Sequence, residues 1–336
     1  MTAPAPAEPA PADATAGALA PFRSRAFLLL WIATVVSNVG TWMNDVGAGW
    51  LMATLAPSPA MVALVQAATT LPIFLFALPA GALADILDRR RLLLAVNLCA
   101  AVVAALFAAV VALELATPAA LLAATFLLGA TAAFAAPAWQ AVVPGLVPRA
   151  ALAPAIALNS LGINISRAIG PVLGGVAIVA LGLYAPFAVN AVSTLGIVAA
   201  LLFWRPPPRP ERTLPPEHVW AAMCAGLRYA RHSGPLRATL ARAAAFFLFA
   251  SCFWAMAPLI VRDVLQAGPE AYGLLMGSVG AGAVTGALLL PTAKRRLGAG
   301  GTADAATLLT AAAMAALALV GGLPAAMAAA ALAGLA

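Results

Sequence analysis

GALADILDRRRLLL, residues 81–94, places five charged side chains within residues 85–91 of a chain that is otherwise almost uncharged. The 39 residues up to the first of these charges, Val46–Ala84, contain no Asp, Glu, Lys or Arg, and neither do the 22 residues that follow the last, Leu92–Leu113. About 20 apolar residues suffice for a helix to cross a hydrocarbon core of roughly 30 Å. The stretch therefore predicts a short polar loop between two membrane spans.

The composition of the whole chain supports a membrane protein. Of its 336 residues, 64% are hydrophobic and 9% are charged, whereas a soluble globular chain carries about 25% charged residues. Backbone groups in lipid must find their hydrogen bonds within the segment, so the spans are expected to be helices. The apolar runs lack the alternating pattern of an outer-membrane barrel. We therefore expect an all-α, polytopic membrane protein.

Basic and thiol side chains point to neither a nucleic-acid partner nor a cofactor. The net charge is +7, but the basic residues lie in short loops beside the spans, where they set topology, and not on one face of a basic domain. The three cysteines, Cys99, Cys224 and Cys252, are scattered and lack metal-ligand spacing. No metal and no cofactor are predicted, and the lipid bilayer is the expected surrounding.

Charges, prolines and glycines divide the chain into segments. Nine spans are expected at about 26–54, 60–84, 92–113, 119–142, 152–181, 185–204, 238–261, 271–291 and 303–321, with a tenth apolar run from Pro324. The expected organisation is a disordered cytoplasmic tail (1–25), a six-helix N-terminal bundle (26–204), a cytoplasmic linker with an amphipathic helix (205–237) and an incomplete C-terminal bundle (238–336).

The basic residues also predict the orientation. Sixteen of them fall at one set of span ends, Arg262 falls at the other set, and Arg167 lies inside a span. Cytoplasmic loops carry an excess of Lys and Arg. This asymmetry predicts a multi-pass protein of the plasma (inner) membrane with its N-terminus in the cytoplasm.

The opening stretch has a second copy. GALADILDRRRLL begins at Gly81 and GALLLPTAKRRLG begins at Gly286, an offset of 205 residues, and each copy carries three basic residues near its end. Two six-helix halves joined by a linker are a transporter layout. A complete second half would extend well beyond Ala336, so we expect a truncated second half with about 9–10 of 12 helices present. The alternative is a genuine ten-helix protein.

The loop resembles the signature of the major facilitator superfamily, Gly-x-Leu-Ala-Asp-Arg-x-Gly-Arg-basic. Ile86 and Asp88 stand where the family has Arg and Gly. The resemblance implies a gate in which Asp85 meets a helix N-terminus and basic side chains of the other half, although that partner lies in an eleventh helix, beyond Ala336. The alternative is that the arginines only anchor the loop in the cytoplasm. The expected gating residues are Gly81, Asp85, Asp88, Arg89, Arg90 and Arg91.

NSLGINISRAIGPVLGG, residues 159–175, is similar to the fifth-helix signature of proton-coupled exporters in that superfamily. With GTWM (40–43) and PAWQAVVPGLVPR (137–149), it gives the chain a resemblance to the branch of enterobactin exporters and transmembrane secretion effectors. The glycines would let another helix approach closely, so helix packing alone is the competing interpretation. The residues that fit the signature are Ser166, Gly170, Pro171, Gly174 and Gly175.

Two charges inside the spans are candidates for a central cavity. A cation near the middle of a bilayer costs about 2.5 kcal/mol or more, so Arg167 should face a cavity or a partner, and Asp45 is a possible partner. We expect Asp45 to change its protonation during transport, with a structural ion pair or a polar group at the outer rim as the alternatives. The expected cavity residues are Asn38, Asp45, Gln66, Asn164 and Arg167.

The sequence thus favours a secondary active transporter, an exporter of drug-like or siderophore-like small molecules that exchanges them for protons. An uptake porter of the same fold and a non-functional fragment remain alternatives. An enzyme is not expected, because both histidines lie in the linker and the acids are scattered. A fused ATPase is excluded for this chain by the lack of a GxxxxGK[ST] motif.

Overall fold

The computed structural model describes residues 17–56, 58–204, 228–229, 231–319 and 321–336, and within these ranges it contains helices and no strands. Eight of the helices are long and apolar enough to cross a membrane. The expected amphipathic helix around Trp220 and most of the expected N-terminal tail lie outside the described residues. The long helices are α1 (Arg25–Leu55), α2 (Pro59–Ile86), α3 (Arg89–Ala112), α4 (Pro118–Val142), α5 (Leu152–Leu181), α6 (Ala185–Phe203), α8 (Gly234–Leu259) and α9 (Pro269–Ala318), followed by the shorter α10 (Leu323–Leu335).

Local sequence explains where these helices begin. The side chains of Ser24, Asp88 and Thr117 accept hydrogen bonds from the backbone N–H groups three residues later, at the starts of α1, α3 and α4. Such caps satisfy donors that the first turn of a helix leaves open. Proline occupies the first or second position of α2, α4, α6, α8, α9 and α10, where its missing N–H has no helical partner to lose.

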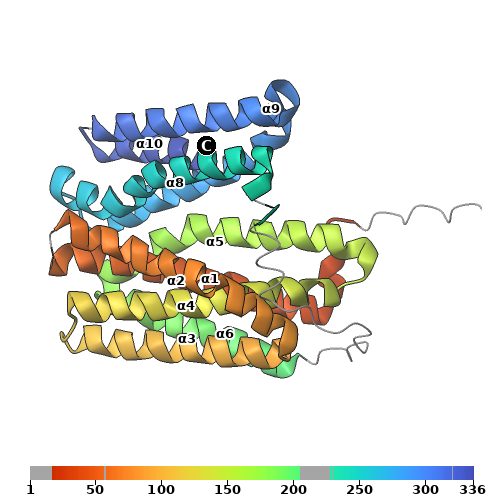
Figure 1. Cartoon of the computed structure of the whole chain (residues 1–336). Coiled ribbons are helices and arrows are strands. Elements are labelled where there is room, and N and C mark those ends of the chain that lie inside the picture. The colour runs from red at the N-terminus through yellow and green to blue at the C-terminus, as the bar shows by residue number, and fades with distance from the viewer. Residues whose placement is uncertain (1–16, 57, 205–227, 230, 320) are drawn as a thin grey trace, which may run out of the picture.

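Two expected boundaries are wrong. Helix α3 begins at Arg89 and not near residue 92, because Asp88 caps it and the arginines form its first turn. The expected spans 271–291 and 303–321 are the two arms of α9, but the ends at 291 and 303 are wrong, because the arms meet at Gly298 (φ 71°, ψ 174°). The chain turns back there, so the second arm of α9 runs opposite to the first (Figure 1). A positive φ is accessible to glycine without strain, so a single residue replaces the expected loop.

The helices form two groups (Figure 1). In the first group, α1 packs against α5 and α6, α2 against α4, and α3 against α4 and α6; in the second, α9 packs against α10 and α8. Loop 87–88, segment 143–151 and the turn between the two arms of α9 lie at one end of the molecule (Figure 1), which we call the arginine-rich end. The connections 113–117 and 265–268 lie at the opposite end. The groups meet mainly through α5 and α9, and also through α2 and α8.

Glycines allow α5 and α9 to touch backbone to backbone. A Cβ on Gly175 would lie 2.6 Å from the carbonyl oxygen of Pro269 and 3.2 Å from the Cα of Gly273. Further along α9, a Cβ on Gly280 would lie 2.7 Å from the backbone nitrogen of Ala168. Such positions have no room for any side chain, and small residues are what allow helices to approach this closely in a membrane. The contact fixes how the two groups sit against one another.

Replacing Gly175 with alanine is expected to loosen this contact. The new methyl group would press on backbone atoms of α9 that cannot rotate away, so the free energy of unfolding should fall by about 1–3 kcal/mol. Thermal unfolding of the purified protein, followed by circular dichroism, measures the change. Gly196→Ala on α6 is the matched control, since nothing lies within 4 Å of its Cβ position. An equal melting temperature for Gly175→Ala and Gly196→Ala would show that the α5–α9 contact is not tight.

Candidate functional site

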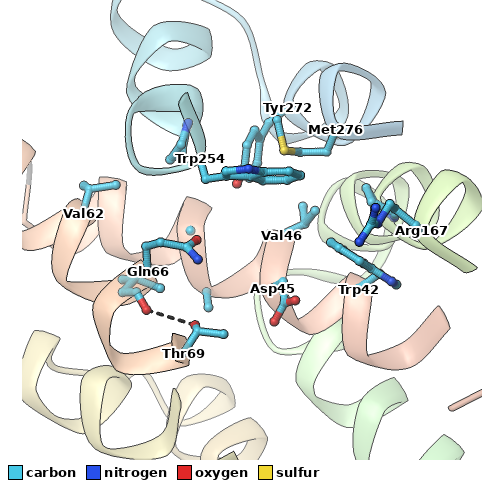
Figure 2. A pocket seen from close by; sticks show the side chains of 15 residues that line it. Trp42, Asp45, Val46, Val62, Gln66, Thr69, Arg167, Trp254, Tyr272 and Met276 are labelled. Atoms are coloured by element: carbon cyan, nitrogen blue, oxygen red, sulfur yellow. Dashed lines mark hydrogen bonds between the residues drawn. The ribbon is translucent and has the colours of Figure 1, made fainter. Parts of the chain in front are cut away.

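A cavity of about 230 Å³ lies where the two helix groups meet. In Figure 2, side chains of α8 and α9 lie on one side of it and side chains of α1, α2 and α5 lie on the other. Most of the lining is apolar or aromatic, which is usual for small-molecule sites. The residues that line it are Trp42, Asp45, Val46, Ala48, Gly49, Val62, Val65, Gln66, Thr69, Arg167, Pro171, Trp254, Pro258, Tyr272 and Met276.

Asp45 brings the single carboxylate of this lining. It lies on α1 and is half-buried. Helix α1 is uncharged from Ala26 to Asn44, and the chain is then uncharged from Val46 to Ala84. Asp45 is therefore the one charged residue of α1 after Arg25. The carboxylate is thus placed where a bound molecule or a proton could meet it.

Arg167 brings the single guanidinium of the lining, from the middle of α5. Its Cζ lies 5.2 Å from the centre of the Trp42 ring, and such an interaction is worth about 2 kcal/mol when water is excluded. Within the described ranges no ion pair joins Arg167 to Asp45. The possible pairing of these two residues is therefore not formed, and the guanidinium lies over the ring of Trp42 instead.

The other expected cavity residues lie in different parts of the structure. Gln66 lines the cavity between the groups from α2. Asn38 lines a second cavity, which lies within the α1–α6 group. Asn164 lines neither cavity, and its side-chain amide donates to the carbonyl oxygen of Ser160 at 2.9 Å. The structure therefore brings together Asp45, Gln66 and Arg167 and leaves Asn164 apart.

Aromatic residues of the second group were not anticipated from the sequence. Trp254 and Tyr272 face the cavity in Figure 2, and Tyr272 also stacks on Trp50 with ring centres 6.2 Å apart. The sequence offers little to find them, because an aromatic side chain in an apolar span can equally face lipid or another helix. They give the cavity flat apolar walls opposite Asp45.

The fifth-helix signature serves helix contacts in the structure. Ser166 is fully buried, and its hydroxyl lies 3.0 Å from the carbonyl oxygen of Val35 on α1 and 2.9 Å from that of Gly162. Gly170 and Gly174 lie against α1, whereas Gly175 lies against α9. Of the five residues, only Pro171 lines the cavity. The signature thus holds α5 between α1 and α9, which places Arg167 at the cavity.

Two arginines in the first turn of α3 bind the ends of other helices. Arg89 Nη1 donates to the carbonyl oxygen of Ala141 at 2.8 Å, in the last turn of α4. Arg90 Nε and Nη2 donate to the carbonyl oxygens of Leu201 and Leu202 at 2.7 and 2.8 Å, in the last turn of α6. The last carbonyls of a helix lack helical partners and carry partial negative charge. The first turn of α3 is therefore bonded to the ends of α4 and α6 at the arginine-rich end.

Asp85 and Asp88 differ in their surroundings. Asp88 Oδ1 accepts from the backbone N–H of Arg91 at 2.9 Å, as the cap of α3. Asp85 is exposed near the end of α2, two residues before the loop. Asp88 therefore has a local structural role in addition to any role in gating.

Residues 16–336 match the family described as transmembrane secretion effector. The chain belongs to this family. The match covers the whole of both helix groups, and it fits the apolar spans, the loop signature and the glycine-rich α5. The expected resemblance to the major facilitator superfamily is confirmed, and the chain is a multi-pass membrane protein of that fold.

Two curated relatives are similar to this secretion-effector family member. It is 30% identical over 156 residues to a staphyloferrin A transporter of Staphylococcus aureus (strain NCTC 8325 / PS 47), an alignment that covers 46% of this chain and 37% of the relative. It is 26% identical over 285 residues to the uncharacterised MFS-type transporter YfiS of Bacillus subtilis (strain 168), which covers 82% of this chain and 66% of the relative. The chain thus spans less than two thirds of each relative's length.

Solved transporter structures share the fold. A bacterial homologue of the human lysosomal transporter Spinster, in an inward-facing and unoccupied conformation, superposes with a TM-score of 0.69 at 18% identity, covering 94% of this chain and 72% of that one. A bacterial homologue of the iron transporter ferroportin gives a TM-score of 0.61 at 15% identity, covering 93% and 81%. The neighbours are transporters and not enzymes, and at these identities they establish the fold alone.

Removing the Arg90 side chain is expected to fray the end of α6. Arg90→Ala would leave the carbonyls of Leu201 and Leu202 without their charged donor. Each such hydrogen bond contributes up to about 1.5–3 kcal/mol of stability. Hydrogen–deuterium exchange of a peptide that covers residues 198–204 should accelerate, by about tenfold for each 1.4 kcal/mol lost. Arg91→Ala, at an exposed neighbouring position, serves as the control. Unchanged exchange in Arg90→Ala would mean that the arginine does not stabilise α6.

Proposed function

We propose that the protein is a secondary active transporter that works by alternating access, with the α1–α6 group and the α8–α10 group rocking around the cavity between them. The observation that carries the proposal is the charge of this cavity. A carboxylate and a guanidinium from different helices face one largely apolar space and do not pair with each other. Ionisable groups inside a membrane are costly and usually mark a substrate or ion path.

Protons are the proposed coupling ion, with Asp45 as the group that binds and releases them. Because Asp45 is not held in an ion pair with Arg167, it can change protonation without first breaking one. In an exporter, the proton would enter from outside as the substrate leaves. The single carboxylate of the lining leaves one candidate in this cavity for that exchange.

The proposed substrates are small molecules of drug-like or siderophore-like character. Flat aromatic walls from Trp254 and Tyr272 suit amphipathic molecules with a planar part. A siderophore-like substrate is also supported by the relative named a staphyloferrin A transporter, which is 30% identical over the aligned part.

The proposed location is the plasma (inner) membrane, with the N-terminus and the arginine-rich end in the cytoplasm. Sixteen of the eighteen basic residues fall at the ends of spans on that side, as the positive-inside rule requires of short loops. The proposed division into a bundle over 26–204, a linker over 205–237 and a second bundle from 238 follows the two helix groups. Asp85, together with the arginines that fix its loop, is the proposed gate on the cytoplasmic side.

Asp45→Asn tests the proposed coupling. The purified protein, reconstituted in liposomes with an imposed pH gradient, should move the fluorescent cation ethidium against its gradient, and the variant should lose this pH-driven movement because asparagine cannot carry a proton. Asp304→Asn is the control, since Asp304 is exposed and forms a surface ion pair, with 3.6 Å between its Oδ1 and Arg242 Nη1.

Equal pH-driven movement in Asp45→Asn and the wild type would contradict Asp45 as the proton carrier. Movement of ethidium only in the direction in which the protons flow would favour an uptake porter over an exporter. If the pH gradient moves no ethidium in the wild type, the proposed proton coupling is wrong.

A further inference from the structure

A second cavity, of about 450 Å³, lies inside the α1–α6 group. At the arginine-rich end it is lined by Leu93 of α3, Trp139 of α4 and Leu201 of α6, and further in it is lined by Asn44 and Asp45 of α1. It therefore runs along the inside of one helix group, whereas the cavity of the proposed substrate site lies between the two groups. The two cavities meet at Trp42, Asp45 and Thr69, which line both.

Some polar side chains of this second cavity already donate to the backbone. The hydroxyls of Thr41, Thr69 and Thr131 each donate to a backbone carbonyl of their own helix, at 3.1, 3.0 and 2.7 Å. The side-chain amide of Asn97 likewise donates to the carbonyl of Leu93, at 2.7 Å. The oxygens of these hydroxyls keep lone pairs for an occupant, and the amides of Asn38, Asn159 and Asn190 in the lining carry both donors and an acceptor oxygen. Water, which both donates and accepts, complements such a lining.

Asn44 strengthens this conclusion. Asn44 is 4% exposed, and its side-chain oxygen is buried without a hydrogen-bond partner in the structure. A buried acceptor left without a partner costs about 1–3 kcal/mol. Polar cavities that are large enough usually hold water that satisfies such groups, and this one has room for several molecules. Water in the cavity would donate to Asn44 and to the neighbouring hydroxyls.

We propose that this cavity is a hydrated path by which protons pass between the arginine-rich end and Asp45 without entering the substrate cavity. Asp45 is the single charged residue of its lining, so no other side-chain charge opposes an excess proton there. On the other side of Asp45, Arg167 of α5 and Tyr272 of α9 face the cavity between the groups. A transported molecule could then occupy the substrate cavity while the proton of Asp45 is exchanged from the other side.

Cysteine labelling tests whether the cavity is wet. In a chain whose native cysteines are replaced by alanine, Asn97→Cys places a thiol at the cavity, and Leu98→Cys places one on the outer face of the same helix, at a position that is 50% exposed. A thiol reacts as its thiolate, which needs water, so methanethiosulfonate ethylammonium should label Asn97→Cys in liposomes at least about tenfold faster than Leu98→Cys. Equal or slower labelling of Asn97→Cys would overturn the hydrated cavity.

Infrared spectroscopy tests whether the cavity leads to Asp45. The C=O band of protonated Asp45, identified by its absence in Asp45→Asn, should appear when the liposomes are acidified on the side of the arginine-rich end. Labelled Asn97→Cys should develop this band at least about tenfold more slowly than unlabelled protein, because the label blocks the water chain. Gln66→Leu, which changes only the substrate cavity, should develop it at the unlabelled rate.

The inference rests on the proposed proton coupling, and the outcomes separate the two. If the band never appears in unlabelled protein, Asp45 does not titrate and both proposals are overturned. If the band appears but labelling at position 97 does not slow it, only the path through the second cavity is overturned. A delay in Gln66→Leu as large as that in the labelled protein would also overturn it, since protons would then pass through the substrate cavity.

Discussion

Backbone contact between α5 and α9 is the constraint on which the arrangement of the two helix groups depends. In lipid there is no hydrophobic force between apolar helices, so close packing must supply the attraction. Gly175, Gly273 and Gly280 let the two backbones touch over several turns. The same packing holds the middle of α5 against the cavity between the groups, so that Arg167 reaches it. A transporter that rocks would have to loosen and re-form this contact.

The arginine-rich end has the opposite character, because it is held by hydrogen bonds from side chains. Arg89 and Arg90 reach the last carbonyls of α4 and α6, and Asp88 caps α3 beside them. The start of α3 is therefore bonded to the ends of two other helices of the first group. This makes the α1–α6 group a stiff unit at that end, which is what a rigid-body motion against the second group needs.

Much of the fold follows from the sequence, whereas less of the site does. Apolar runs bounded by prolines and charges predicted α1 to α6 closely, since length and hydropathy decide a span. The turn at Gly298 lies inside the expected connection between the spans 271–291 and 303–321, but it is shorter than expected, because the basic residues at 294–296, which are typical of a loop, continue the helix. The bonds of Arg89 and Arg90 and the aromatic wall opposite Asp45 join residues far apart in the chain. Only the packing of helices brings them together, and no local pattern encodes it.

The central claim is that the two helix groups move as units about the cavity that holds Asp45. Spin-label distances test it most directly, with one pair at Leu181 and Val264 at the opposite end and one pair at Arg149 and Leu297 at the arginine-rich end, all of which are exposed. Between alkaline and acidic pH, the account predicts that one distance lengthens while the other shortens. Distances that stay unchanged at both ends, or that lengthen together, would contradict it.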